Sequence, residues 1–175
     1  MASNGHWITE FIRDIDDFPT KGVNFRDITP LLGDGKGFVR AVDELADRFD
    51  GVGADRVLGI EARGFILAAP VAYRMGAGFV PVRKAGKLPW AVVREDYSLE
   101  YGHDKLEIHR DAIRPGERIL VIDDVLATGG TAAATVRLVE ALGGLVVGVG
   151  VLIELEDLQG RARLEGHVVE SLARY

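Results

Sequence analysis

Residues 119–131 read ILVIDDVLATGGT, and this stretch decides the fold. Its apolar start predicts a buried strand over Arg118–Ile122, directly followed by the carboxylates Asp123 and Asp124. A turn with two glycines and two threonines comes next, and a helix is expected over Gly130–Leu142. The stretch is therefore a strand–loop–helix unit whose loop lies at the carboxyl end of the strand, where open α/β sheets bind ligands.

The loop residues have the chemistry of a phosphate site. The Gly-Gly pair lets successive backbone N–H groups converge on an anion, and the following helix N-terminus adds positive dipole. Threonine hydroxyls can donate as well. The predicted cradle for one phosphate monoester consists of Ala127, Thr128, Gly129, Gly130 and Thr131. Neither the Gly-Lys-Ser/Thr of a Walker A loop nor the G-x-G-x-x-G dinucleotide turn is present.

The two acids before this cradle restrict the class of phosphate ligand that the site can bind. Asp123 and Asp124 would repel a polyphosphate, whereas they can accept hydrogen bonds from vicinal ribose hydroxyls. The pattern therefore predicts a site for ribose 5-phosphate. The alternative is a solvated strand end followed by a plain turn.

The rest of the chain alternates between apolar strands and helical periods. Strands are predicted over Arg56–Ile60, Gly78–Val82 and Leu145–Ile153, and helices over Trp7–Ile15, Gly37–Phe49 and Gly64–Met75. Residues 22–27 are expected to be irregular or briefly extended, after Pro19 ends the first helix. Strands that are apolar throughout and separated by helices indicate an α/β class, doubly wound, with a mainly parallel sheet flanked by helices.

The stretch 84–103 breaks this alternation, because it has a proline, Pro89, together with alternating charges and no helical period. A structureless loop of this length is unusual inside a compact domain and typical of a mobile cover. We interpret it as a lid. The alternative is a β excursion, with hairpin strands around residues 97–108.

Composition excludes several functional classes. The 175 residues fit one domain, 1–175, and a net charge of −6 argues against a nucleic-acid partner. The absence of cysteine excludes disulfides, thiolate metal sites and cysteine nucleophiles. The longest apolar run, Leu145–Ile153, is far below the roughly 20 residues of a membrane helix. Without a visible signal peptide at residues 1–10, a cytoplasmic protein with no membrane partner is expected.

Five motifs, in order along nearly the whole chain, carry a family resemblance. The 119–131 stretch resembles the phosphoribosyl-diphosphate (PRPP) signature of the type I phosphoribosyltransferases. The other four motifs are similar to those of the adenine phosphoribosyltransferases: FPTKGVNFRDI (18–28), EARGF (61–65), RKAGKLP (83–89) and YSLEYG (97–102). The resemblance implies a type I fold with a small N-terminal base-binding hood over residues 1–34 and a flexible lid over 84–103.

The implied function is a glycosyltransferase of purine salvage. It would transfer the 5-phosphoribosyl group from PRPP to adenine and release AMP and diphosphate. The resemblance also implies a homodimer and Mg²⁺, which would be bound mainly through the PRPP diphosphate. No protein metal ligand is predicted, since the histidines lack metal-ligand spacing.

Cationic residues are the candidates for the diphosphate. Arg63 follows a predicted strand, so it should lie at the ligand edge of the sheet, where a guanidinium fork suits a diphosphate. Arg83, Lys84 and Lys87 are three cations within five residues of an acidic chain. For Arg63, the alternative is an ordinary surface ion pair. For the three cations at 83–87, the alternative is a basic stretch that is simply solvated. The resemblance adds a cis peptide near Glu61-Ala62.

The remaining site residues come from the resemblance. Glu100 would be the catalytic acid/base group that meets adenine, with Tyr101 closing beside it on the lid. Asn24, Phe25 and Arg26 would form the adenine site, in which the aromatic ring stacks on the purine. The alternative for Phe25 is a core position.

Two other functions remain open at this stage. One is transfer to another purine base, xanthine or hypoxanthine, on the same scaffold. The other is a regulator that senses PRPP and performs no chemistry. Glu100 and the cationic stretch 83–87 favour catalysis over the regulator.

Overall fold

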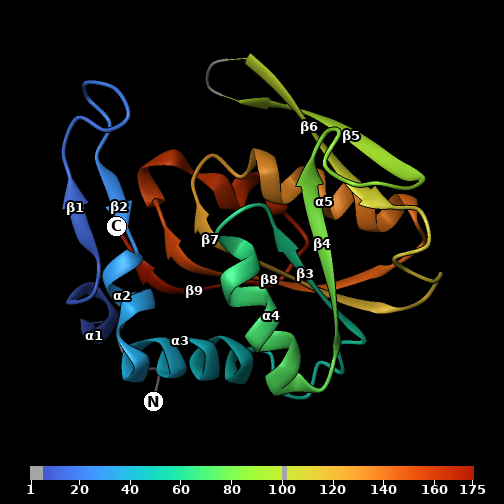
Figure 1. The fold of residues 1–175 in the computed structure, drawn as a ribbon, viewed down its shortest axis with the longest axis horizontal. Helices are drawn as coiled ribbons and strands as arrows, with labels where there is room; N and C mark the ends of the chain where they lie inside the picture. The colour runs from blue at the N-terminus through green and yellow to red at the C-terminus, as the bar shows by residue number, and fades with distance from the viewer. Residues whose placement is uncertain (1–5, 100–101) are drawn as a thin grey trace.

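The computed structural model describes residues 6–99 and 102–175. Within these residues a seven-stranded sheet forms the centre of the molecule, with strand order β5-β6-β4-β3-β7-β8-β9 (Figure 1). Its strands are β3 (Arg56–Ile60), β4 (Gly78–Lys84), β5 (Val92–Leu99), β6 (Gly102–His109), β7 (Arg118–Leu126), β8 (Leu145–Glu154) and β9 (Val169–Arg174). Five neighbouring strands pair in parallel, in the order β4-β3-β7-β8-β9. The strand β6 pairs antiparallel with both β4 and β5. The mainly parallel α/β sheet is confirmed.

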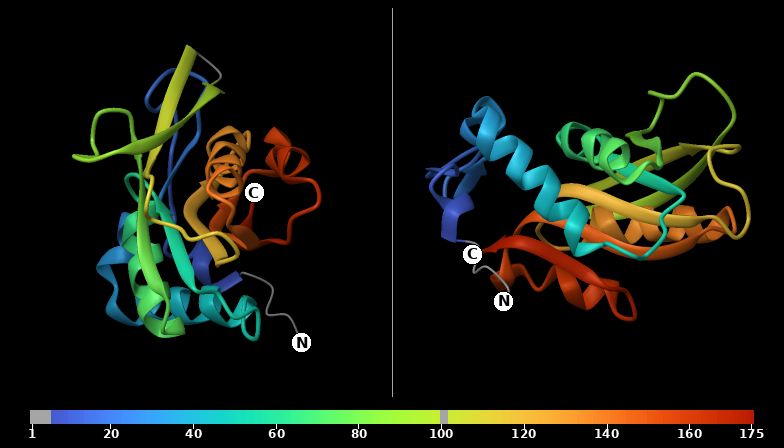
Figure 2. Two further views of the ribbon diagram at one scale, coloured as in Figure 1. Left: turned by 90° about the vertical axis from the view of Figure 1, so that its right-hand side faces the viewer. Right: turned by 90° about the horizontal axis from the view of Figure 1, so that it is seen from below.

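Helices cover both faces of this sheet. α3 (Gly35–Arg48) and α4 (Gly64–Met75) lie on one face, and α5 (Gly130–Ala141) lies on the other (Figure 2). Each face has its own apolar core: Leu45, Leu67 and Leu120 belong to the first, Leu58, Val121 and Leu138 to the second. Strands buried on both faces explain the continuous apolar runs in the sequence.

Local sequence explains where these helices begin and how closely they pack. The side chain of Asp34 accepts a hydrogen bond from Gly37 N at 2.7 Å and so caps α3. Gly59 on β3 lets α4 approach, because a Cβ there would lie 2.8 Å from Ala68 Cβ and from the Phe79 ring. The predicted bounds of β3 and α4 agree with the structure at both ends.

The predicted helix over Trp7–Ile15 is wrong in its second half. α1 (His6–Thr9) is short, and β1 (Arg13–Ile15) pairs antiparallel with β2 (Phe25–Asp27). Ion pairs across this ribbon join Arg26 to Asp14 and, at 3.8 Å, Arg13 to Asp27. These cross-strand contacts favour the extended form over the helical period. The extended alternative for residues 22–27 is correct over β2, which leads into α2 (Thr29–Gly33).

The expectation that 84–103 has an irregular backbone is also wrong, whereas its role as a lid stays a prediction. β5 and β6 form a hairpin whose register runs from Val92↔His109 to Leu99↔Gly102, so the β excursion is the observed form. The alternating charges follow the period of a strand: the Asp96–Lys105 ion pair spans the hairpin at 3.2 Å. Leu106 and Ile108, both on β6 of the hairpin, are buried in the core. In Figure 1 the hairpin and the β1–β2 ribbon extend beyond the same edge of the sheet.

The C-terminal quarter contains elements that the sequence analysis did not anticipate. Two 3-10 helices, η1 (Glu156–Leu158) and η2 (Gly160–Leu164), connect β8 to β9. Strand β9 then completes the sheet beside β8. In the described part of the chain, no helix has the length and apolarity needed to cross a membrane.

Candidate active site

The β7–α5 connection forms a small hollow at the carboxyl end of the central strands. Residues 123 and 125–132 line this space, whose volume is about 70 Å³. Gly129 adopts a left-handed φ of 78° and precedes the first turn of α5, so the loop turns sharply into the helix N-terminus. The structure thus brings the five predicted cradle residues together around one cavity of a size that suits a phosphate group.

Strand β7 is longer than predicted. It continues beside β8 to the Leu126↔Glu154 pair, so Asp123 and Asp124 lie within the strand rather than after it. Their carboxyl groups lie close enough to interact with each other, and Arg63 lies near both. Asp124 is buried, with 6% of its surface exposed. Gly64, at the start of α4, leaves room for Asp123, since a Cβ there would lie 2.7 Å from Asp123 Oδ1.

The two carboxylates also influence each other's charge. Burial raises the pKa of Asp123 well above its usual range, and the adjacent Asp124 carboxylate raises it further. Two effects act in the opposite direction: Asp124 N donates to Asp123 Oδ1 at 2.9 Å, and Arg63 is nearby. A ligand hydroxyl that donates to Asp123 would stabilise the ionised form.

Arg63 connects the acid pair to the N-terminal ribbon. Its Nε lies 2.6 Å from Asp124 Oδ2, and its guanidinium carbon lies 5.0 Å from the centre of the Phe25 ring. Asp124 Oδ2 nevertheless accepts no hydrogen bond within the described residues, because the Arg63 N–H does not point at it. The prediction that Arg63 lies at the ligand edge of the sheet is confirmed, and a buried acceptor remains available beside it.

The predicted base-site residues face different neighbours. Phe25 packs edge-to-face on Phe18 at 5.2 Å between ring centres, on the side of Arg63. Arg26 instead stacks on the ring of Tyr175 at 4.1 Å. Asn24 is exposed, directly before β2. Phe25 therefore contacts another predicted site residue, Arg63, through its ring.

The cations after the predicted strand Gly78–Val82 are held by carboxylates that the sequence analysis did not single out. Arg83 and Lys84 lie on the extended β4. Arg83 binds Glu61 through two contacts, at 3.2 and 3.1 Å, and this pairing holds the pKa of Glu61 below its usual value. Lys84 Nζ lies 3.2 Å from Asp104 Oδ2, which raises the pKa of Lys84.

Lys87 differs from these two cations. It is exposed, and no carboxylate of residues 6–99 and 102–175 forms an ion pair with its ammonium. The turn that carries Lys87 is anchored to β6, because Gly86 N donates a hydrogen bond to the buried Glu107 at 2.9 Å. The structure thus presents one solvent-facing cation on an anchored turn beside two cations already paired.

The last two predicted residues, Glu100 and Tyr101, lie outside the described residues. The hairpin itself contacts the cradle. Tyr97 is buried, which raises its pKa; its hydroxyl donates to Asp104 Oδ2 at 3.4 Å and lies near Thr131 of the cradle, which lowers that pKa. In the sequence, the signal that could have indicated this contact is Tyr97 itself, an aromatic residue within the charged 84–103 stretch.

The peptide bond Glu61-Ala62 is cis, as the resemblance implied, and so is Phe18-Pro19. Among the described residues, no cluster of three or more histidine or acidic side chains could hold a metal ion. As a whole, the site offers an anion cradle, two acids for hydroxyl groups and a set of cations.

Comparison with known proteins identifies relatives of the whole chain. The model of the phosphoribosyl transferase domain matches residues 32–173. The adenine phosphoribosyltransferase of Symbiobacterium thermophilum is 57% identical over 164 residues, which are 94% of this chain and 96% of that protein. That of Desulfitobacterium hafniense is also 57% identical, over 95% of this chain and 96% of that protein.

Solved structures agree with these relatives. The adenine phosphoribosyltransferase of Thermoanaerobacter pseudethanolicus superposes with a TM-score of 0.95 at 49% identity, covering 98% of this chain and all of that one. The Saccharomyces cerevisiae enzyme, solved with an imino-altritol bisphosphate and adenine, gives a TM-score of 0.92 at 36% identity, covering 98% and 99% of the two chains.

Proposed function

This chain belongs to the adenine phosphoribosyltransferase family, and on that premise we propose how its residues transfer the 5-phosphoribosyl group from PRPP to adenine. The products are AMP and diphosphate, and the reaction is a step of purine salvage. The two other functions left open by the sequence, a different purine base and a PRPP sensor, are not those of the relatives described above.

We assign the sugar phosphate to the β7–α5 loop. The backbone N–H groups of the loop and the N-terminus of α5 would bind the 5-phosphate inside the hollow lined by Ala127–Thr131. Asp123 and Asp124 would accept hydrogen bonds from the ribose hydroxyls. The unsatisfied Oδ2 of buried Asp124 supports this assignment, because buried acceptors in proteins normally have a donor.

The diphosphate would lie toward Arg63, Arg83, Lys84 and Lys87. Arg63 reaches the ribose side of the site, and Lys87 stands free of carboxylate partners in the described part of the chain. We propose that Lys87 contacts the diphosphate directly, while Glu61 and Asp104 hold Arg83 and Lys84 in place.

Mg²⁺ fits this arrangement as a partner of the substrate. Because the described residues provide no three-ligand cluster, the diphosphate oxygens would supply most of its ligands. Bound there, the ion would neutralise charge that develops on the leaving diphosphate.

Adenine would stack on Phe25, between the ribbon and Arg63, with Asn24 and Arg26 in the same strand region. Glu100 and Tyr101 would close over it from the hairpin, and Glu100 would exchange the proton of the base. This part of the proposal depends on the family resemblance, since both residues lie outside the described ranges.

These positions define a reaction in which a ring nitrogen of adenine attacks the anomeric carbon while the diphosphate leaves from the opposite face. Positive charge grows on the ribose in the transition state, so the ionised acid pair stabilises it electrostatically. The cradle and the acid pair fix the sugar, and catalysis rests on this positioning. Closure of the hairpin would exclude water, which would otherwise hydrolyse the activated sugar.

We also propose a homodimer in the cytoplasm. The dimer is supported by large apolar side chains that remain exposed on α4 and β4: Ile66 at 43%, Phe79 at 38% and Tyr73 at 90%. A second copy covering this surface would remove apolar area from water.

The observation that carries the proposed mechanism is the acid pair of β7 beside the hollow of the β7–α5 loop. The test is the rate of AMP formation from PRPP with adenine, compared with product formation from hypoxanthine and xanthine. We expect turnover with adenine to exceed the others by several orders of magnitude, because oxo-purines offer an acceptor where the site expects a donor. Zero turnover with tight PRPP binding would instead support the sensor.

A further inference from the structure

The phosphate loop, Ala127–Thr131, packs backbone against backbone on the turn at Gly160. A Cβ on Gly160 would overlap the carbonyl oxygen of Ala127 and lie 3.0 Å from Gly129 N. Conversely, a Cβ on Gly129 would overlap the carbonyl oxygen of Gly160. Two segments thirty residues apart in sequence thus touch through main-chain atoms on both sides.

This kind of contact leaves no room for adjustment. A crowded side chain can change rotamer, whereas a crowded carbonyl can move only if its whole segment moves. The atoms in contact with Gly160 belong to the loop whose residues line the hollow, and whose backbone N–H groups bind the 5-phosphate in the proposed function. The position of residue 160 therefore sets where those N–H groups point.

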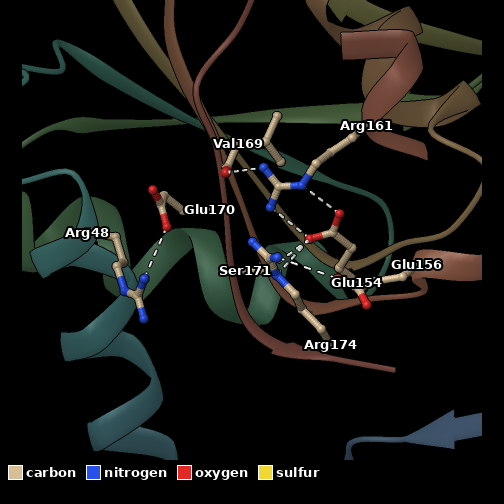
Figure 3. A network of polar contacts seen from close by, with 8 residues as sticks. All are labelled: Arg48, Glu154, Glu156, Arg161, Val169, Glu170, Ser171 and Arg174. Atoms are coloured by element: carbon tan, nitrogen blue, oxygen red, sulfur yellow. Dashed lines mark hydrogen bonds and ion pairs between the residues drawn. The ribbon is translucent and has the colours of Figure 1, made fainter. Parts of the chain in front are cut away.

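Arg161, the residue after Gly160, belongs to a polar network that includes Glu154, Val169 and Ser171 (Figure 3). Arg161 Nε and Nη2 bind the two carboxylate oxygens of Glu154 at 2.6 and 2.7 Å, and Arg161 Nη1 donates to Val169 O at 2.7 Å. Glu154 is 5% exposed and also accepts from Ser171 Oγ at 2.9 Å. The guanidinium fork thus ties the residue after Gly160 to both β8 and β9.

The same network joins the loop at its other end. Glu154 pairs in register with Leu126, the residue before the cradle, and Leu155 N donates to Leu126 O at 2.9 Å. The loop is therefore held at Leu126 through the strand ladder and at Gly129 through the Gly160 turn.

We propose that Gly160 is a positioning residue for 5-phosphate binding, and that the Arg161–Glu154 ion pair holds it against the phosphate loop. The inference rests on the proposed function, in which this loop binds the 5-phosphate. Gly160 does not contact the substrate. It acts through the backbone of Ala127 and Gly129, so its effect is specific to the phosphate-bearing substrate.

The test is Gly160→Ala, assayed for AMP formation with each substrate varied in turn. A displacement of the loop by about 1 Å is expected to raise the KM for PRPP by roughly tenfold to a hundredfold. The KM for adenine should stay within twofold. Inorganic phosphate, used as a competitor of PRPP, should inhibit the variant more weakly by a similar factor. A general loss of structure would not separate the two substrates in this way.

Two further variants complete the experiment. Gly35→Ala is the matched control, because a Cβ there meets nothing within 4 Å, and it should leave both KM values unchanged. Arg161→Lys keeps the charge but loses the fork, and it should raise the KM for PRPP in the same direction by a smaller factor. It keeps the test decisive if Gly160→Ala fails to fold.

The outcomes separate this inference from the proposed function. If the wild-type protein makes no AMP, the proposed function fails. If the wild type is active and a folded Gly160→Ala variant keeps its KM for PRPP, or if both KM values rise equally, the positioning role is overturned.

Discussion

Arg63 Nε lies 2.6 Å from Asp124 Oδ2, so the last residue of the turn between β3 and α4 meets a buried carboxylate of β7. The two side chains come from adjacent parallel strands whose carboxyl ends share one edge of the sheet. In the proposed complex, the carboxylate would bind a ribose hydroxyl and the guanidinium would bind the diphosphate. The negative carboxylate thus meets the hydroxyl donor of the substrate, and the positive guanidinium meets its diphosphate anion.

Arg63→Lys tests the arginine half of this pair. Lysine keeps the charge but cannot make the planar fork, so we expect kcat/KM for PRPP to fall by about a hundredfold, or roughly 2.7 kcal/mol of transition-state stabilisation. Steady-state kinetics with PRPP varied gives the answer. Arg74→Lys is the control, because Arg74 binds Asp43 and Asp47 on the exposed side of α4, away from the site. Equal kinetics for both variants would contradict the role of Arg63.

Asp124→Asn tests the carboxylate half. The amide keeps the shape but removes the charged acceptor, so the KM for PRPP should rise by about tenfold or more, in line with roughly 1.5–3 kcal/mol for a charge-assisted hydrogen bond. The circular dichroism spectrum should not change. A variant with the wild-type kcat and KM for PRPP would remove Asp124 from ribose binding.

Asp123→Asn should trade stability against function. Because the pKa of Asp123 is raised in the folded state, the folded form binds this proton more tightly than the unfolded form. Stability is therefore lost as pH rises from the ordinary value for an aspartate through the raised folded pKa, because the buried carboxyl group resists ionisation. Replacing it should raise the Tm at neutral pH by roughly 2–4 °C for each kcal/mol regained.

Thermal unfolding of both proteins between about pH 5 and pH 8 measures this effect. The advantage of the variant should grow with pH, while its KM for PRPP rises. A variant that is less stable than the wild type at every pH would show that Asp123 is not under electrostatic strain.

Glu100→Gln tests the proton-transfer role. Loss of the acid/base group should lower kcat by about 10²- to 10⁴-fold, with smaller effects on the KM values. Glu95→Gln is a matched control on the same hairpin, since Glu95 binds Arg137 of α5 at 2.5 Å. An unchanged kcat in Glu100→Gln would exclude Glu100 from the reaction.

The sequence predicts the sheet and the strand–turn–helix form of residues 119–131 well for physical reasons. Parallel strands buried on both faces, such as β3, must be apolar throughout, and Gly129 adopts a left-handed φ of 78° in a turn that leads into a helix N-terminus. These requirements are local, so residues 119–131 carry them without help from the rest of the chain.

Contacts made across the fold could not be predicted in the same way. Whether Arg13–Ile15 is helical or extended depends on Arg26, which pairs with Asp14 from the neighbouring strand. The stretch after Lys84 looks irregular until Glu107 and Lys105 are placed opposite Arg94 and Asp96. Tertiary pairing decides both cases, and local propensity does not show it.

The same limit applies within the site. Arg83 and Lys84 were recognisable as cations, but their partners Glu61 and Asp104 lie about twenty residues away in sequence in each case. Gly160 gave no signal at all, because a close approach of two backbones has no sequence pattern of its own.

A crystal structure of the protein with AMP bound tests the central claim most directly. The account predicts the 5-phosphate within hydrogen-bond distance of backbone N–H groups in the hollow between Asp123 and Ala132, with both ribose hydroxyls on the acid pair of β7. Nucleotide bound elsewhere, with this hollow free of phosphate, would contradict it.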